Sequence, residues 1–140
     1  NADIEIDEII HAVKKIKSGK SPGIDRLPIE MVKTSIHVIK HDLQKLFNHI
    51  LKMGTYPSTW GEGLRVAIPK GEGDIRPITI ERIFPKILET VLDQRINFIN
   101  EAFQKTDCYN GGFLKDSRTQ DNLFILTSCL QKQLLTGQKV

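Results

Sequence analysis

The stretch from Leu64 to Ile80 most constrains what this chain can fold into, because two short β-branched runs flank a glycine-rich connection within it. In both runs apolar residues alternate with polar or small ones, and this period of two is typical of a half-buried strand. Gly71 and Gly73 allow the positive φ angles that a tight turn requires. Pro77 has no backbone donor, so the second strand is expected at a sheet edge or a bulge. The stretch therefore predicts a β-hairpin.

Two cations lie close together in this hairpin. Lys70 and Arg76 flank the turn, on backbone that is expected to be accessible to solvent. A pair of cations beside glycines suits a phosphate group, because ammonium and guanidinium groups donate charge-assisted hydrogen bonds to its oxygens. An ordinary solvated hairpin tip would carry the same residues. From the residues alone, both interpretations stay open.

Apolar residues at helical spacing predict helices on both sides of the hairpin. The expected helices cover residues 6–16, a short segment over 29–33, a longer one over 36–53, and two more after residues 80 and 117. The helix after residue 80 is expected to bury one stripe of apolar residues: Ile87, Leu88, Val91, Leu92 and Ile99. The pattern predicts the α+β class, as a mainly helical domain that carries one β-hairpin.

Three local signals add detail to this fold. The stretch Ser117-Arg118-Thr119-Gln120 has the form of a capping box for the last helix. Gly23 and Asp25 are expected to fix a turn in the preceding loop. Trp60 is expected to pack behind the hairpin as an apolar anchor.

Composition sets broad limits on the function. The 140 residues fit one domain or part of a larger one, with 39% hydrophobic and 26% charged residues, as in ordinary soluble proteins. A net charge of +3 permits a nucleic-acid partner without requiring one. No apolar run approaches the roughly 20 residues of a transmembrane helix, so no membrane partner is expected.

No metal site is expected from the cysteines and histidines. Cys108 and Cys129 are too far apart for a zinc-binding pair, and we expect reduced, packing-type cysteines in an intracellular protein. His37 and His41 have an i, i+4 spacing that can bind zinc, but no third ligand accompanies them. Exposed surface histidines are the favoured interpretation.

Several short motifs follow one another in a characteristic order. They are GKSPGIDRLP at 19–28, YPSTW at 56–60, the hairpin ending in RPI, KILETVLDQRI at 86–96, NGGF at 110–113 and TQD at 119–121. This succession resembles the N-terminal part of the reverse transcriptases of non-LTR (LINE-like) retrotransposons. The resemblance covers nearly the whole chain. Each motif alone arises by chance, so the signal lies in their order.

The resemblance implies one partial domain over residues 1–140, the fingers subdomain and the start of the palm of a right-hand polymerase fold. Lys70 and Arg76 match basic residues that approach the triphosphate of the incoming nucleotide. Lys20, Gly112 and Phe113 would contact nucleic acid, although a solvated loop cation and a packed turn also explain them. The implied partners are an RNA template, a DNA primer, a dNTP, and the palm and thumb of the same polypeptide.

The sequence departs from the family pattern at several positions. Arg26 stands where the family's G-K-[SA]-P-G-x-D-G loop has its last glycine, and Asn110 stands where the family has Gln. In the family, the aspartates that hold Mg²⁺ lie beyond the position of Val140. Two-metal phosphoryl transfer needs such carboxylates, so we expect this chain alone to be inactive, with Mg²⁺ a cofactor of the intact enzyme only.

Three hypotheses follow from the sequence. The chain is a fragment of an RNA-directed DNA polymerase, a truncated module that only binds nucleic acid, or a remnant without function. The resemblance implies an intracellular location, nuclear for relatives of this kind. The resemblance favours the polymerase fragment, and the other two hypotheses are kept as alternatives.

Overall fold

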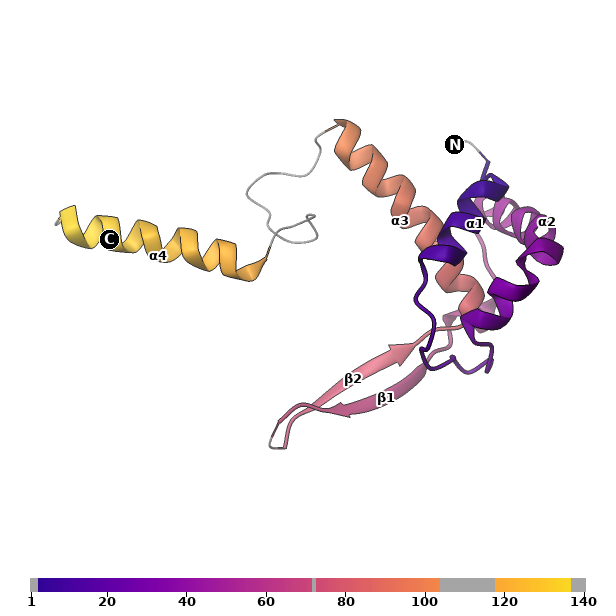
Figure 1. The fold of residues 1–140 in the computed structure, drawn as a ribbon, viewed down its shortest axis with the longest axis horizontal. Coiled ribbons are helices and arrows are strands. Elements are labelled where there is room, and N and C mark those ends of the chain that lie inside the picture. The colour runs from indigo at the N-terminus through magenta and orange to yellow at the C-terminus, as the bar shows by residue number, and fades with distance from the viewer. Residues whose placement is uncertain (1–2, 72, 104–117, 137–140) are drawn as a thin grey trace. The chain divides into compact units, whose positions relative to one another are not determined.

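The computed structural model describes residues 3–71, 73–103 and 118–136, and the chain divides into two compact units, Asn1–Ile96 and Asn97–Val140 (Figure 1). The elements in chain order are α1 (Ile6–Lys15), α2 (Ile29–Met53), the 3-10 helix η1 (Ser58–Gly61), β1 (Leu64–Pro69), β2 (Ile75–Ile80), α3 (Ile83–Phe103) and α4 (Thr119–Thr136). These helices and the single hairpin confirm the α+β class. Within the described residues, no helix combines the length and the apolar character that crossing a bilayer requires.

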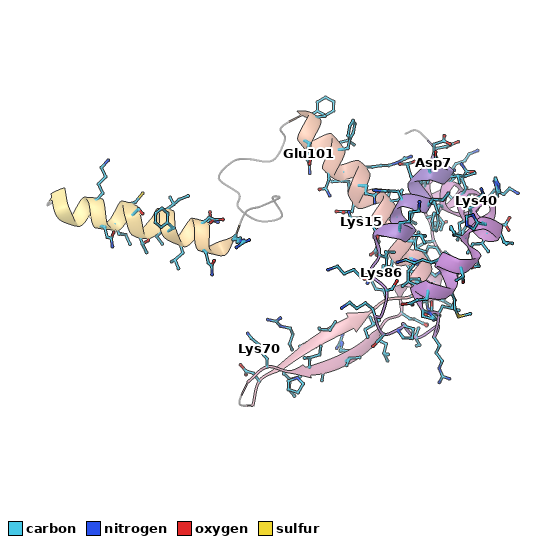
Figure 2. All side chains as sticks on the ribbon, in the orientation of Figure 1. Asp7, Lys15, Lys40, Lys70, Lys86 and Glu101 are labelled. Carbon is cyan, nitrogen blue, oxygen red and sulfur yellow. The ribbon has the colours of Figure 1, made fainter. Side chains whose placement is uncertain are left out.

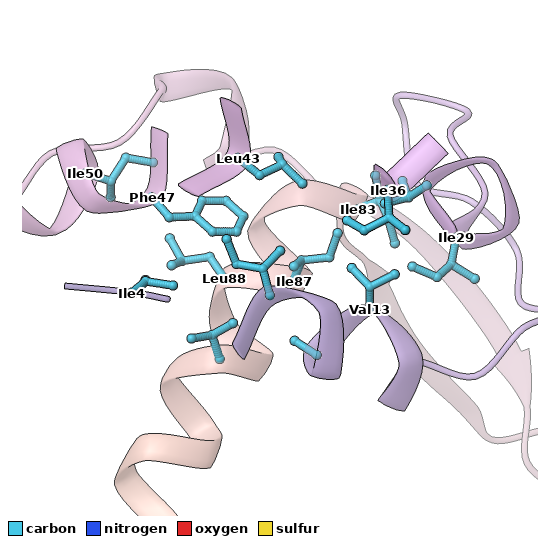
Figure 3. Close-up of a cluster of buried hydrophobic side chains, with 14 residues drawn as sticks. Ile4, Val13, Ile29, Ile36, Leu43, Phe47, Ile50, Ile83, Ile87 and Leu88 are labelled. Carbon is cyan, nitrogen blue, oxygen red and sulfur yellow. The ribbon is translucent and has the colours of Figure 1, made fainter. Parts of the chain in front are cut away.

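The core of the first unit lies between α1, α2 and the first half of α3 (Figure 3). Phe47 of α2 is fully buried in one cluster with residues from both other helices, among them Ile9 and Ile87. Trp60 of η1 packs edge-on against Phe47, with ring centroids 6.5 Å apart and an interplanar angle of 77°. Such T-shaped pairs are a favourable aromatic geometry. The prediction that Trp60 is an apolar anchor is confirmed.

One prediction about the helices is wrong. The two helices expected over 29–33 and 36–53 form a single continuous helix, α2. Thr34 and Ser35 separate the two apolar patterns, but their hydroxyls donate to carbonyls one turn earlier, including that of Met31 at 2.9 and 2.7 Å. Because these side chains satisfy their polar groups within the helix, they do not end it.

The hairpin register explains why two prolines are tolerated in it. β1 and β2 pair antiparallel, from Leu64 opposite Ile80 to Pro69 opposite Ile75. Beyond that pair, the Lys70 N–H donates to the Asp74 carbonyl at 2.7 Å. Hydrogen-bonded and non-hydrogen-bonded pairs alternate along an antiparallel ladder. Pro69 and Pro77 therefore fall in non-hydrogen-bonded pairs, where the nitrogen points away from the partner strand.

The hairpin is confirmed, but its strands are not half-buried. All residues of β1 are exposed, and in β2 only Ile80 is partly buried. Alternation in the sequence specifies which residues share a face, whereas burial also needs a partner, and no described residue covers these strands. The apolar stripe of α3 is likewise shorter than expected, because Ile99 is 44% exposed and Leu92 is the last residue of α3 against the core.

In the second unit, the N-terminus of α4 has a cap that is shifted by one residue from the prediction. The Asp121 carboxylate accepts the Arg118 N–H at 2.8 Å, immediately before the helix. Ser117, which the sequence predicted as the cap, lies outside the described residues, as do Cys108, Gly112 and Phe113. Cys129 in α4 is exposed.

Candidate functional site

The two cations of the hairpin lie on the same face of the ribbon. Arg76 is directly opposite Ile68, and Lys70 is opposite Asp74, two pairs further toward the turn. Successive pairs on one face are two residues apart, so Lys70 and Arg76 are diagonal neighbours, a relation that spans about 7–8 Å. Both residues are exposed, and Figure 2 shows Lys70 at the far end of the hairpin. A single phosphate chain could contact both side chains.

An apolar stripe continues from these cations along the same face. It consists of the residues at alternate positions of both strands: Leu64, Val66, Ile68, Ile78 and Ile80. The first four are between 36% and 43% exposed, which is high for side chains of this type. Near the turn this face of the hairpin thus carries Lys70 and Arg76, with the exposed Asp74 opposite Lys70, and toward its base it is apolar.

The loop between α1 and α2 is fixed by hydrogen bonds at both of its ends. The Gly19 N–H donates to the Glu30 carboxylate at 2.6 Å, and this bond holds the pKa of Glu30 below its usual range. The Gly23 carbonyl accepts the Arg26 N–H at 3.0 Å, which confirms the predicted turn. Lys20 lies exposed between these two anchored points.

Asp25 connects this loop to the start of α3. Its Oδ1 accepts the Leu27 N–H at 3.3 Å, and its Oδ2 accepts the Ile83 N–H at 3.1 Å. Ile83 is the first residue of α3, whose N-terminal N–H groups have no partner within the helix. The sequence predicted only the turn and missed this cap, because 58 residues separate Asp25 from Ile83.

Backbone conformation explains two further positions in the loop. A Cβ atom on Gly23 would lie 2.3 Å from the Glu81 carbonyl oxygen, so only glycine allows the loop to approach the β2–α3 junction this closely. Arg26 has φ of +56°, in the left-handed region that favours glycine. The family's glycine at that position therefore matches the backbone, and Arg26 adopts the same conformation at a cost.

Three lysines surround an open hollow beside the loop, which we call the lysine hollow. Its volume is about 180 Å³, and its rim carries Lys17, Lys20 and Lys86. The lining between them is mostly apolar and includes Leu27, Ile80, Ile83 and two prolines. Figure 2 shows Lys86 on α3 near the base of the hairpin. The structure thus places Lys20 with two lysines that the sequence did not single out, and not with Lys70 and Arg76.

Carboxylates near the hollow are fewer than the lysines. Glu81 lies in its lining. Burial, together with the charge and hydrogen bond of Glu81, raises the pKa of Glu89 on α3. Lys86 partly opposes this shift, since its charge lowers the pKa of Glu89. The rim as a whole is cationic.

Two arginines hold the supporting structure, and the sequence indicated neither of them. Arg82 donates to the Thr59 carbonyl at 2.7 Å and to the Glu62 carboxylate at 2.9 Å, which ties the base of the hairpin to η1. Arg95 donates two bonds of 2.7 Å to Glu8, a bidentate pair between α3 and α1. The pair lowers the pKa of Glu8, chiefly through the hydrogen bond from Arg95.

The described residues do not include a metal site. Among them, no group of three or more His, Cys, Asp or Glu side chains lies together. His37 and His41 are exposed on α2. The described residues therefore do not fit a catalytic Mg²⁺ site.

Comparison with known proteins finds relatives among the proteins of retrotransposable elements. The chain is 27% identical over 125 residues to the 115 kDa protein of the type-1 retrotransposable element R1DM of Drosophila melanogaster, covering 84% of this chain and 12% of that protein. It is 26% identical over 131 residues to the probable RNA-directed DNA polymerase from transposon BS of the same species, covering 89% and 14%. It is 28% identical over 102 residues to the retrovirus-related Pol polyprotein of the type-1 element R1 of Bradysia coprophila, covering 68% and 10%.

These matches confirm the resemblance that the motif order indicated. No protein-family model matches the chain. The chain spans only about a tenth to a seventh of the length of these relatives.

Proposed function

We propose, on the premise that this chain is related to proteins of non-LTR retrotransposons, that it forms the fingers region of an RNA-directed DNA polymerase. One relative is named a probable RNA-directed DNA polymerase and another a retrovirus-related Pol polyprotein, and both are far longer than this chain. The proposed role of this part is to bind the substrates. Primer extension would take place in the longer protein, on an RNA template with a DNA primer.

The observation that carries the proposal is the shared face of Lys70 and Arg76. Their diagonal placement at the exposed end of a hairpin allows both to contact one triphosphate. A guanidinium can donate two parallel bonds to a phosphate, and an ammonium adds a compact charge. These are the interactions that neutralise the charge of a transferring phosphoryl group. Mg²⁺ would be held by carboxylates of the longer protein.

The test compares two arginines of the same ribbon. Arg76 is on the face of Lys70, whereas Arg65 is opposite Thr79 on the other face. Amide chemical shifts of the 140-residue chain are followed during titration with a dNTP and with inorganic tripolyphosphate. We expect shifts at the hairpin end, and about fivefold to tenfold weaker binding in Arg76→Ala, because one charge-assisted contact is lost.

Arg65→Ala is the matched control, since it removes the same charge from the same strand pair. It should bind the triphosphate within about twofold of the parent chain. Equal losses in the two variants would mean that general charge attraction accounts for the binding, and they would refute the proposed site. So would the absence of any shift at the hairpin end.

A further inference from the structure

The lysine hollow and the apolar stripe of the hairpin are parts of one continuous surface. Ile80 is the last residue of the stripe and also lines the hollow. Arg76 lies next to the other end of the stripe, four residues before Ile80 on β2, so the distance along the strand from Arg76 to Ile80 is about 13 Å. Cations therefore lie at both ends of an exposed apolar path, with Lys70 and Arg76 at one end and the rim lysines at the other.

The rim lysines are available for an anion. Lys17, Lys20 and Lys86 are all exposed. The ion pairs found between described residues join Lys15 to Asp93, Arg82 to Glu62, and Arg95 to Glu8, so they do not include any of the three. Glu81 is the one carboxylate among the residues that line the hollow. An anionic ligand would meet a net positive rim.

The size and lining of the hollow limit the ligand. At about 180 Å³ it is smaller than the roughly 300–1,000 Å³ of pockets that enclose a whole small molecule. Its apolar lining would accept a base or a sugar while the attached phosphate stays at the rim. An apolar path between two cationic ends would suit a chain in which apolar and anionic parts repeat.

We propose that the lysine hollow binds one nucleotide unit of a single-stranded nucleic acid, which continues along the apolar stripe toward the hairpin end. The inference rests on the proposed function, since it names the path of a strand beside the triphosphate contact. The lining offers few polar groups to read a base edge, so binding is tolerant of sequence. Single strands have free base faces and sugars for such contacts, whereas paired bases are stacked inside a duplex.

The experiment uses two triple variants of the 140-residue chain. The hollow variant carries Lys17→Ala, Lys20→Ala and Lys86→Ala. The control variant carries Lys14→Ala, Lys45→Ala and Lys52→Ala, three exposed lysines that do not line the hollow. Both variants lose the same charge. Thermal melts establish that each is folded before fluorescence anisotropy is measured with labelled oligo-U and oligo-A across a salt series.

The parent chain should bind both oligonucleotides with a slope of log K against log salt of about −3.5, since each of the three rim lysines, Lys70 and Arg76 contributes about −0.7 when it neutralises a single-strand phosphate. The hollow variant should bind at least about tenfold more weakly at 50 mM salt, with a slope of about −1.4 from Lys70 and Arg76. The control variant should keep the parent slope. Equal losses in the two variants, or an unchanged hollow variant, would overturn the inference.

Two further measurements identify the ligand. In the first, inorganic phosphate competes with the labelled strand. If phosphate displaces the strand as effectively as an unlabelled oligonucleotide, the hollow is a simple anion site and the inference is overturned. Tighter binding of a duplex than of a single strand would also overturn it. The tripolyphosphate titration of the hairpin is repeated on the same samples. If its shifts persist while strand binding fails, only the inference about the hollow falls. If strand binding persists while those shifts are missing, the proposed triphosphate site falls.

Discussion

Replacing Gly23 by alanine should destabilise the protein through a single backbone collision. The added Cβ atom would lie 2.3 Å from the Glu81 oxygen, 2.8 Å from the Glu81 carbon and 3.1 Å from the Arg82 nitrogen. The first separation is about 1 Å short of ordinary van der Waals contact. All three are backbone atoms, so no side-chain rotation relieves the overlap.

The neighbouring backbone is also held in place. The Asp25 carboxylate binds the Ile83 N–H, and Arg82 binds the Thr59 carbonyl at 2.7 Å. Either the loop or the β2–α3 junction must move, and forced shifts of this kind in packed regions typically cost about 1–3 kcal/mol. For a folding unit of this size, each kcal/mol lowers the melting temperature by about 4–8 °C.

Gly61→Ala is the control for this prediction. A Cβ atom at Gly61 meets nothing within 4 Å, and its φ is not positive. The alanine there should leave the free energy of unfolding within about 0.5 kcal/mol of the parent or raise it slightly. Urea denaturation followed by circular dichroism measures both variants. A Gly23→Ala midpoint that matches Gly61→Ala would refute the reasoning.

Three further predictions concern stability. Arg26→Gly should raise the free energy of unfolding by about 0.5–1 kcal/mol, measured in a thermal melt. The strain of an arginine at φ of +56° costs more than the extra conformational entropy that glycine loses on folding. A lower melting temperature than that of the parent would contradict this. Asp25→Ala should lower it by about 0.5–2 kcal/mol, since the Ile83 N–H loses its cap, and hydrogen exchange should rise first at the start of α3. Glu8→Gln should destabilise the chain at neutral pH, but the difference from the parent should shrink as the pH falls below about 4.3. The folded-state pKa of Glu8 is lowered, so its contribution is present above the unfolded-state pKa and lost as the pH falls through the folded value. A pH-independent difference in urea midpoints would argue against the Glu8–Arg95 pair as its source.

The sequence predicted the local elements well because their signals are local. The turn between the two strands lies at Gly71 and Gly73, as the sequence indicates, and Trp60 packs as its aromatic bulk suggested. The break expected near Thr34 and Ser35 was wrong, since these hydroxyls satisfy themselves within the helix. A polar interruption in an apolar pattern is therefore weak evidence for the end of a helix.

Contacts between distant residues could not be predicted in the same way. The sequence placed Lys20 in a loop, but its neighbours Lys17 and Lys86 come together only because Gly23 packs against the β2–α3 junction. The pairing of Glu8 with Arg95 spans 87 residues and leaves no local pattern. The order of motifs in the sequence indicated the family resemblance, whereas the lysine hollow could be found only from the three-dimensional structure.

The two prolines of the hairpin determine how other molecules can meet it. An exposed strand usually offers a row of free N–H groups to which a further strand can add, in aggregation or in peptide recognition. On β1 that outward row is interrupted at Pro69, and on β2 at Pro77. A third strand that added to either edge of the hairpin would thus find one backbone donor missing. The gap in the donor row weakens the addition of a strand at each edge, which favours ligands that contact the side chains of the hairpin.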